Sequence, residues 1–219
     1  MGSHWDLGSA QRDIVKVCWA GTLEFCAYKY SPVDLTIPPR NLFAFNEDFN
    51  EDISGWNVSG VTDFSSLFWE ANSFDQNLGK WDVSRAETMK CMFCGAKSYR
   101  GAGLEQWGNK LHHVHDMYNM FEGSGIRSDV VSLNGWNVSS VTMMREMFRN
   151  TKNFHETLCW DTVGHATIAT DMFNETNACF DKSCVLPSIA EQAGCSGAKS
   201  LGTVLAVALM GLVTLVFAR

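Results

Sequence analysis

The sequence predicts an α/β repeat protein: a parallel solenoid of about five coils, each with one short strand and one short helix, followed by a hydrophobic C-terminal helix. Tryptophans recur 24 to 29 residues apart, at Trp56, Trp81, Trp107, Trp136 and Trp160. A Leu-Phe or Met-Phe pair keeps nearly the same period, at positions 67–68, 92–93, 120–121, 147–148 and 172–173. An uncharged apolar run closes the chain. We call the two recurring series the Trp ladder and the Phe ladder. Two series of residues that share one period of this length are typical of stacked-repeat architectures.

The segment after each tryptophan predicts the strand. Residues 57–62, Asn-Val-Ser-Gly-Val-Thr, alternate β-branched and small polar side chains, which suits a brief strand. The segment before the next tryptophan, residues 74–80, is rich in Asp, Asn and Gly, so we expect a turn there.

The segment around each Met-Phe pair predicts the helix. Phe64, Leu67, Phe68 and Ala71 stand at i, i+3, i+4 and i+7, which is the apolar stripe of a helix. The other units repeat this spacing. A side-chain oxygen precedes the stripe where a helix N-cap would lie, at Asp63, Thr88 and Asp116.

These elements are too short to bury their apolar side chains alone, so they must stack on neighbouring coils. We expect the repeats to occupy residues 41–184, after an N-terminal cap or irregular segment at 1–40. A small, polar segment at 185–200 is expected to be a linker. Residues 201–218 are then a transmembrane or anchor-signal segment.

The apolar run from Leu201 to Ala218 is 18 residues long and lies between Lys199 and Arg219. A helix of this length just spans a bilayer core of roughly 30 Å. A buried core helix is the first alternative, and the apolar character of all faces of the run argues against it. A cleaved lipid-anchor signal is the second, since small residues precede the run at 194–198. The spacer is shorter than such signals use, which favours a true span.

The repeat unit resembles the BspA-like leucine-rich-repeat surface proteins, and more narrowly the mycoplasma-type repeat, a domain of unknown function. The resemblance lies in Trp-Asn-Val-Ser, Val-Thr, Met-x-x-Met-Phe and a Phe-Asn turn, which residues 137–148 match nearly throughout. It implies a leucine-rich-repeat-like solenoid, display at a cell surface, and binding rather than catalysis. Two units depart from the pattern, those that begin at Trp107 and Trp160.

Eight cysteines bear on the compartment. Six lie toward the two ends of the chain, and their even count suits disulfides formed in an oxidising compartment: Cys18, Cys26, Cys159, Cys179, Cys184 and Cys195. The Cys91-x-x-Cys94 motif has no second ligand pair at zinc-site spacing. We expect structural thiols there, with a disulfide, or metal or redox chemistry, as alternatives.

The candidate binding residues form a polar group on the strand face. Aligned on the Phe ladder, Glu87 and His115 lie on neighbouring coils at one position, and Arg85, His113 and His165 share another. We expect a solvated, pH-sensitive patch here rather than a metal site. Asn57, Asn137 and Asn174 begin glycosylation sequons, which would be used only in an exported protein.

Composition and missing motifs narrow the function. The net charge of −7, without a basic run, disfavours nucleic acid as a partner. The chain has no hydrolase, zinc-protease or phosphate-loop signature, so we expect no catalytic residue, no metal and no cofactor. The prediction is a membrane-anchored surface interaction or adhesion module for a protein or glycan. The alternative is an enzyme of unrecognised type that uses the His/Glu group. A tail-anchored protein with cytosolic repeats is the alternative location.

Overall fold

The computed structural model describes residues 39–160, 167–181, 183–184 and 187–193 of the 219-residue chain. The chain divides into two units, residues 1–33 and 34–219, and all described residues belong to the second. The predictions for residues 1–38, for most of the linker and for the helix at 201–218 therefore lie outside the described residues.

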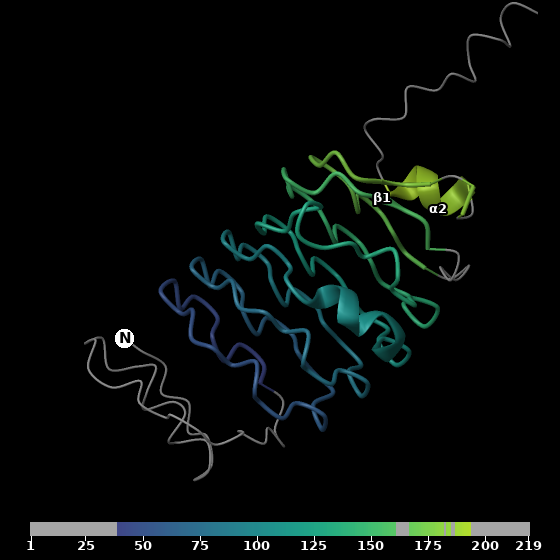
Figure 1. Ribbon diagram of the computed structural model, residues 1–219. Coiled ribbons are helices and arrows are strands. Elements are labelled where there is room, and N and C mark those ends of the chain that lie inside the picture. Colours follow the sequence, from purple (N-terminus) through teal and green to yellow (C-terminus); the bar gives the residue numbers. More distant parts are fainter. Residues whose placement is uncertain (1–38, 161–166, 182, 185–186, 194–219) are drawn as a thin grey trace, which may run out of the picture. The chain divides into compact units, whose positions relative to one another are not determined.

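The predicted leucine-rich-repeat-like α/β solenoid, with a strand and a helix in every coil, is wrong. The described residues form two helices and two strands, and most of the rest lie in turns and irregular segments. The elements are the 3-10 helix η1 (Leu104–Lys110), β1 (Thr157–Leu158), β2 (Cys179–Phe180) and the α-helix α2 (Pro187–Gln192) (Figure 1). No helix within these residues has the length and apolar character that a membrane span needs.

The repeat period itself is present in the packing. Successive repeats lie side by side in chain order, as the colours of Figure 1 show. A phenylalanine ring of each repeat stacks on that of the next, with centroids 5.4–5.8 Å apart, in the column Phe43, Phe68, Phe93, Phe121, Phe148 and Phe173. The core of the stack is therefore a continuous column of aromatic rings.

The tryptophans join the repeats by a second route. The indole Nε1–H of four of the repeating tryptophans donates to a backbone carbonyl of the preceding repeat, as in Trp81 to Ile53 at 3.0 Å and Trp160 to Leu133 at 2.8 Å. Trp107 and Trp136 bond in the same way to Leu78 and Leu104. These four large rings are thus buried without leaving their donors unsatisfied.

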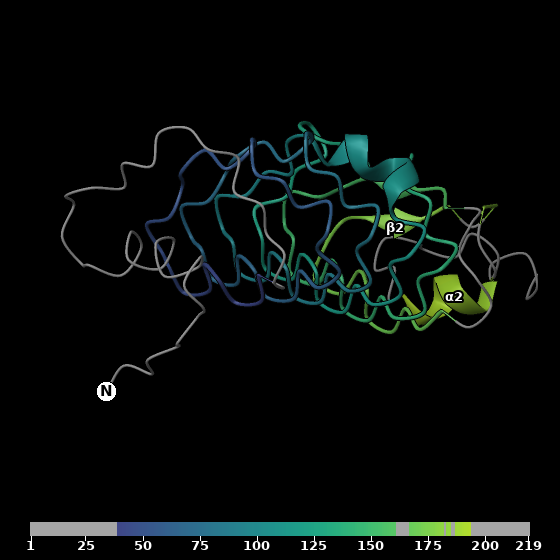
Figure 2. The same ribbon diagram turned by 90° about the horizontal axis from the view of Figure 1, so that it is seen from below.

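Backbone hydrogen bonds explain why the apolar stripe does not form a helix. In the repeat that begins at Trp56 the amides of Ser66 and Phe68 donate to carbonyls of the next repeat, at 2.9 Å each. The amide of Leu67, between them, donates three residues back within its own turn, at 3.3 Å. An α-helix needs every amide for its own i−4 carbonyl. Because alternate amides donate hydrogen bonds to the neighbouring repeat, the chain forms tight turns instead of a helix. These turns lie in one row in Figure 2.

These turns place two residues of every repeat in the left-handed region, two positions before and two after the column phenylalanine. Their φ values are all between 53° and 66°. The positions before are Asn41, Ser66, Cys91, Asn119, Glu146 and Asp171, and those after are Phe45, Glu70, Gly95, Gly123, Asn150 and Glu175. Ten of the twelve are not glycine, although this conformation costs a non-glycine residue about 1–2 kcal/mol. The stacking contacts must therefore offset a repeated local cost.

The described segments that were predicted as strands form no strand, and one bridging residue per repeat directly follows them. Single parallel bridges run Asp63 to Thr88, Asp116, Met143 and Ile168. The predicted N-cap residues lie in this column. Asp63 and Asp116 accept hydrogen bonds from the amides two residues on, at 2.9 Å each. These are the hydrogen bonds of a turn, and no helix follows them.

Helix α2 covers the last repeat. The amides of Asp171 and Phe173 donate to the carbonyls of Gln192 and Ala193, at 2.9 and 2.8 Å. Ile189 and Ala193 are buried against the stack. Residues 187–193, which were expected to belong to a linker, thus cap the C-terminal end of the repeats.

Candidate interaction surface

The predicted binding residues lie on the side of the stack that carries the single bridges. Arg85, Glu87, His113 and His115 are all exposed. The amide of His115 donates to the carbonyl of Glu87 at 2.9 Å, so these two residues are neighbours on consecutive repeats. Among the described residues, no hydrogen bond or ion pair joins the side chains of Arg85 and His113, and His165 lies outside them. We call Arg85, Glu87, His113 and His115 the polar patch.

The third repeat supplies a histidine loop beside this patch. The rings of His112 and His113 lie 4.3 Å apart, and Nδ1 of His112 is 3.3 Å from the carbonyl oxygen of Asn109. The next repeat holds the loop, since Ser140 Oγ donates to the carbonyl of His112 at 2.6 Å. The described residues contain no group of three or more side chains able to hold a metal ion. The backbone of the patch is therefore fixed while its side chains face solvent.

Two of the three sequon asparagines have a structural role. The side-chain oxygens of Asn57 and Asn137 each accept the amide hydrogen of the serine two residues on, at 3.1 Å. Asp82 takes the equivalent place in the second repeat and accepts from Ser84 at 3.2 Å. The turn needs a short side-chain acceptor, so the motif arises whether or not a glycan is attached. Asn174 is exposed and stands beside the phenylalanine column instead.

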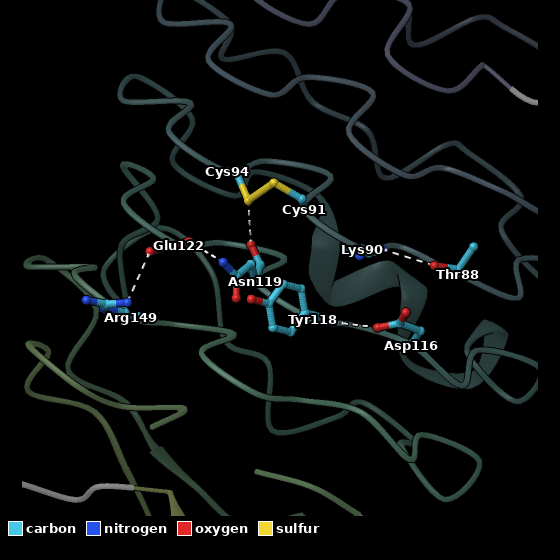
Figure 3. Close-up of a disulfide and its surroundings, with 9 residues drawn as sticks. All are labelled: Thr88, Lys90, Cys91, Cys94, Asp116, Tyr118, Asn119, Glu122 and Arg149. Atoms are coloured by element: carbon cyan, nitrogen blue, oxygen red, sulfur yellow. Dashed lines mark hydrogen bonds and ion pairs between the residues drawn. A yellow bond between two sulfur atoms is a disulfide. The ribbon is translucent and has the colours of Figure 1, made fainter. Parts of the chain in front are cut away.

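A second group of side chains, of which the sequence analysis singled out only Cys91 and Cys94, lies on the surface of the left-handed turns, and Figure 3 draws part of it. It consists of the residue two before and the residue one after the column phenylalanine. In three consecutive repeats these positions are joined by different links. Cys91 and Cys94 form a disulfide, Asn119 donates its side-chain amide to Glu122, and Arg149 donates to Glu146 at 3.0 Å. We call these three pairs the turn links.

The two glutamates of the turn links have opposite electrostatics. Burial raises the pKa of Glu122 above its ordinary value, with the nearby Glu146 adding to this and Arg149 opposing it. Burial also raises the pKa of Glu146, but hydrogen bonds from Arg145 and Arg149 outweigh it and leave the pKa lowered. Neighbouring turns thus hold one carboxylate that resists ionisation and one that favours it.

The disulfides correct the expectation of free thiols at Cys91 and Cys94, and they give one pairing among the cysteines toward the C-terminal end. Cys91 and Cys94, expected as structural thiols, are joined, with Cα atoms 4.9 Å apart. Cys159 and Cys184 are joined across two repeats, with Cα atoms 5.1 Å apart. Cys179 also belongs to a disulfide. Cys18, Cys26 and Cys195 lie outside the described residues.

A fixed offset from the column phenylalanine would have grouped these positions in the sequence, although it does not show that the two side chains of a pair bond. Each pair stands at the same two positions, three residues apart, and each holds side chains able to bond. Lys90 and Tyr118 both stand three residues before the column phenylalanine of their repeats, and the Lys90 ammonium lies 5.2 Å from the centroid of the Tyr118 ring.

An interior of stacked rings, a backbone bonded from repeat to repeat and surface positions that vary define a stacked-repeat protein. A family model described as "Mycoplasma protein of unknown function, DUF285" matches residues 37–132 and 109–184, which together cover more than half of the chain, and the chain belongs to this family. No curated protein and no solved structure matches.

Proposed function

We propose that this chain is a surface interaction or adhesion module that binds a protein or a glycan through the polar patch. The observation that carries the proposal is the hydrogen bond from the amide of His115 to the carbonyl of Glu87, which fixes exposed charged and imidazole side chains of two repeats in register. A backbone that is rigid before binding loses little conformational entropy on contact with a partner. The patch offers a cation, a carboxylate and two imidazoles, which suits polar recognition.

The location of the module is also a proposal. The resemblance of the repeat signature to BspA-like leucine-rich-repeat surface proteins supports display at a cell surface. The apolar run from Leu201 to Ala218 supports attachment to a membrane. The sequence feature and the resemblance together favour repeats that face outward, on the same side as a partner.

Binding of the labelled, purified chain to intact cells tests the proposal. A variant with Arg85→Ala, Glu87→Ala, His113→Ala and His115→Ala is expected to lose saturable binding about tenfold or more, as loss of several central polar contacts predicts. The matched control is Lys97→Ala with Lys152→Ala, which removes two exposed charges from another position of the repeat and is expected to bind normally.

Pretreatment of the cells identifies the partner. Loss of binding after protease treatment indicates a protein, and loss after glycosidase treatment indicates a glycan. Equal binding by the patch variant and the control would remove the patch from the proposal. A turnover activity that disappears only in the patch variant would favour an enzyme instead.

Deletion of residues 201–219 tests the membrane attachment. The shortened chain is expected to move from the membrane to the soluble fraction and to keep the unfolding transition of the full chain. Loss of folding would show that this segment packs on the repeats, and an unchanged membrane fraction would place the attachment elsewhere.

A further inference from the structure

The Cys91–Cys94 disulfide closes a turn that the fold closes anyway. In the next two repeats the same positions carry noncovalent links, Asn119 with Glu122 and Arg149 with Glu146. The backbone bond of the turn is present in all three repeats. It runs from the amide of Cys94 to the carbonyl of Cys91 at 3.3 Å, and at 3.1 Å in each of the other two turns. The covalent bond is therefore not needed for the shape of the turn.

The surroundings of Cys94 suit a thiol as well as a disulfide sulfur. Sγ of Cys94 lies 3.0 Å from the carbonyl oxygen of Asn119, in the next repeat (Figure 3). A disulfide sulfur carries no hydrogen, so this contact becomes a hydrogen bond only when Cys94 is reduced, because a thiol then donates to the carbonyl. The repeat thus holds a partner ready for the reduced form. Cys94 is 5% exposed, so this partner prevents a buried, unsatisfied thiol.

The two sulfurs also differ in access. Cys91 is half-buried, whereas Cys94 is buried between the turns. An incoming thiolate therefore meets Cys91 first. Exchange requires a direct approach to one sulfur and a leaving group on the other, and the pair supplies both.

We propose that Cys91 and Cys94 form a thiol–disulfide exchange site for external dithiols and disulfides. The thiolate of an external dithiol attacks Sγ of Cys91, the S–S bond breaks, and Cys94 leaves as a thiolate that takes a proton from solvent. The second thiolate of the dithiol then attacks the first sulfur of the dithiol, which is bonded to Cys91 in the mixed disulfide. This attack closes the external disulfide. Cys91 leaves as a thiolate and takes a second proton. The protein gains two electrons and two protons, which the dithiol loses.

The Cys159–Cys184 disulfide has a different role, because it joins two repeats. That bond joins residues 25 positions apart on two repeats, beside the paired strands β1 and β2. Its closed loop is a whole repeat, so it constrains the chain as a cross-link between repeats. The Cys91–Cys94 loop encloses only two residues and links nothing beyond its own turn.

A redox titration of the full chain with dithiothreitol in its reduced and oxidised forms tests the proposal. Alkylation followed by peptide mass mapping gives the fraction of reduced Cys91 and Cys94, and far-UV circular dichroism with tryptophan fluorescence gives the folded fraction. The expected result is complete reduction and re-oxidation of this pair with both folded signals unchanged. Opening of the pair only together with loss of the folded signals would overturn the proposal.

Single-cysteine variants test the order of attack. With oxidised glutathione, the Cys94→Ser variant is expected to form a mixed disulfide at Cys91 about tenfold faster than the Cys91→Ser variant forms one at Cys94, because rates follow access. Serine at position 94 keeps a hydroxyl for the Asn119 carbonyl, which protects the fold. Equal rates, or faster reaction at Cys94, would overturn the assigned order, and no mixed disulfide in either folded variant would overturn the site.

Discussion

Inside the stack each repeat places the same ring on the ring of its neighbour, whereas on the surface of the same turn three consecutive repeats are closed by three different pairs of side chains. The column rings keep centroid distances of 5.4–5.8 Å through six repeats. The turn links change from a disulfide to an amide–carboxylate bond and then to an ion pair. Contacts between repeats must match in shape because the interior is close-packed. A turn already held by its backbone accepts any link.

The largest expected effect breaks the column of rings. Phe121 is fully buried and stacks on Phe93 at 5.5 Å and on Phe148 at 5.4 Å. Phe121→Ala is expected to lower the free energy of unfolding by about 3–5 kcal/mol, since it leaves a cavity between two repeats. Urea denaturation measures it.

Asn119→Ala in the same turn is the matched surface variant. It removes one turn link and leaves the column intact, so about 1 kcal/mol is expected. The comparison of interior and surface fails if Asn119→Ala costs as much as Phe121→Ala.

The two disulfides give the next largest effect. Replacing Cys159 and Cys184 by serine removes a cross-link between repeats with a sequence separation of 25, for which the chain-entropy estimate is about 3.5 kcal/mol. Replacing Cys91 and Cys94 by serine, at a sequence separation of 3, is expected to lower the free energy of unfolding by about 2 kcal/mol or less. Urea midpoints of the two double variants measure the difference. A larger loss for the Cys91 and Cys94 pair would show that this link stabilises more than its own turn.

The sequence predicts the columns but not the turns between them. The Trp and Phe ladders are read from spacing alone, and the structure stacks the phenylalanines repeat on repeat and stacks Trp136 between Trp107 and Trp160. The apolar spacing i, i+3, i+4 and i+7 also fits a chain whose alternate amides bond to the next repeat, so periodicity could not separate a helix from these turns. Asn119, Gly123 and Asn150 favour left-handed φ and pointed to the turns. Ser66, Glu70 and Glu175 at equivalent positions obscured that signal.

The candidate surfaces show the same division. Aligning Glu87 with His115 from the ladder predicted their neighbouring places, because register follows from the period. The bond between Cys91 and Cys94 could not be predicted from a helical position, since its geometry belongs to the turn. Pairing at a surface position depends on the local backbone, which the period does not specify.

The interior contains a tyrosine hydroxyl, that of Tyr99, at a position where the preceding repeat has a phenylalanine. Tyr99 stands where Phe74 stands one repeat earlier, with its ring 4.0 Å from that of Phe93. Its hydroxyl is buried and has no hydrogen-bond partner among the described residues, and burial raises its pKa well above the ordinary value. Tyr99→Phe is expected to stabilise the protein by about 1 kcal/mol, because it removes an unsatisfied polar group and keeps the ring.

Urea denaturation checks the sign of this change. Phe74→Tyr, which adds a hydroxyl at the equivalent place, is the reverse variant and is expected to destabilise. A loss of stability in Tyr99→Phe would show that the hydroxyl has a partner.

The smallest expected effect separates two neighbouring turn links by their dependence on pH. The lowered pKa of Glu146 means that its stabilising contribution is present above the ordinary value of 4.5 and is lost as the pH falls through the folded-state pKa. Glu146→Gln is therefore expected to destabilise the protein at neutral pH. The loss should be only about 1 kcal/mol, because Arg145 and Arg149 are half-exposed and solvent screens their charges.

The raised pKa of Glu122 has the opposite effect: the stabilising contribution of Glu122 is fully present below pH 4.5 and is lost as the pH rises. Glu122→Gln keeps an acceptor for Asn119 and is expected to stabilise slightly at neutral pH. Urea midpoints of both variants and the parent, measured from pH 7 to pH 3, should converge at the acidic end. Parallel curves over this range would contradict the assignment of opposite electrostatics to the two links, and would mean that shape alone decides what each turn accepts.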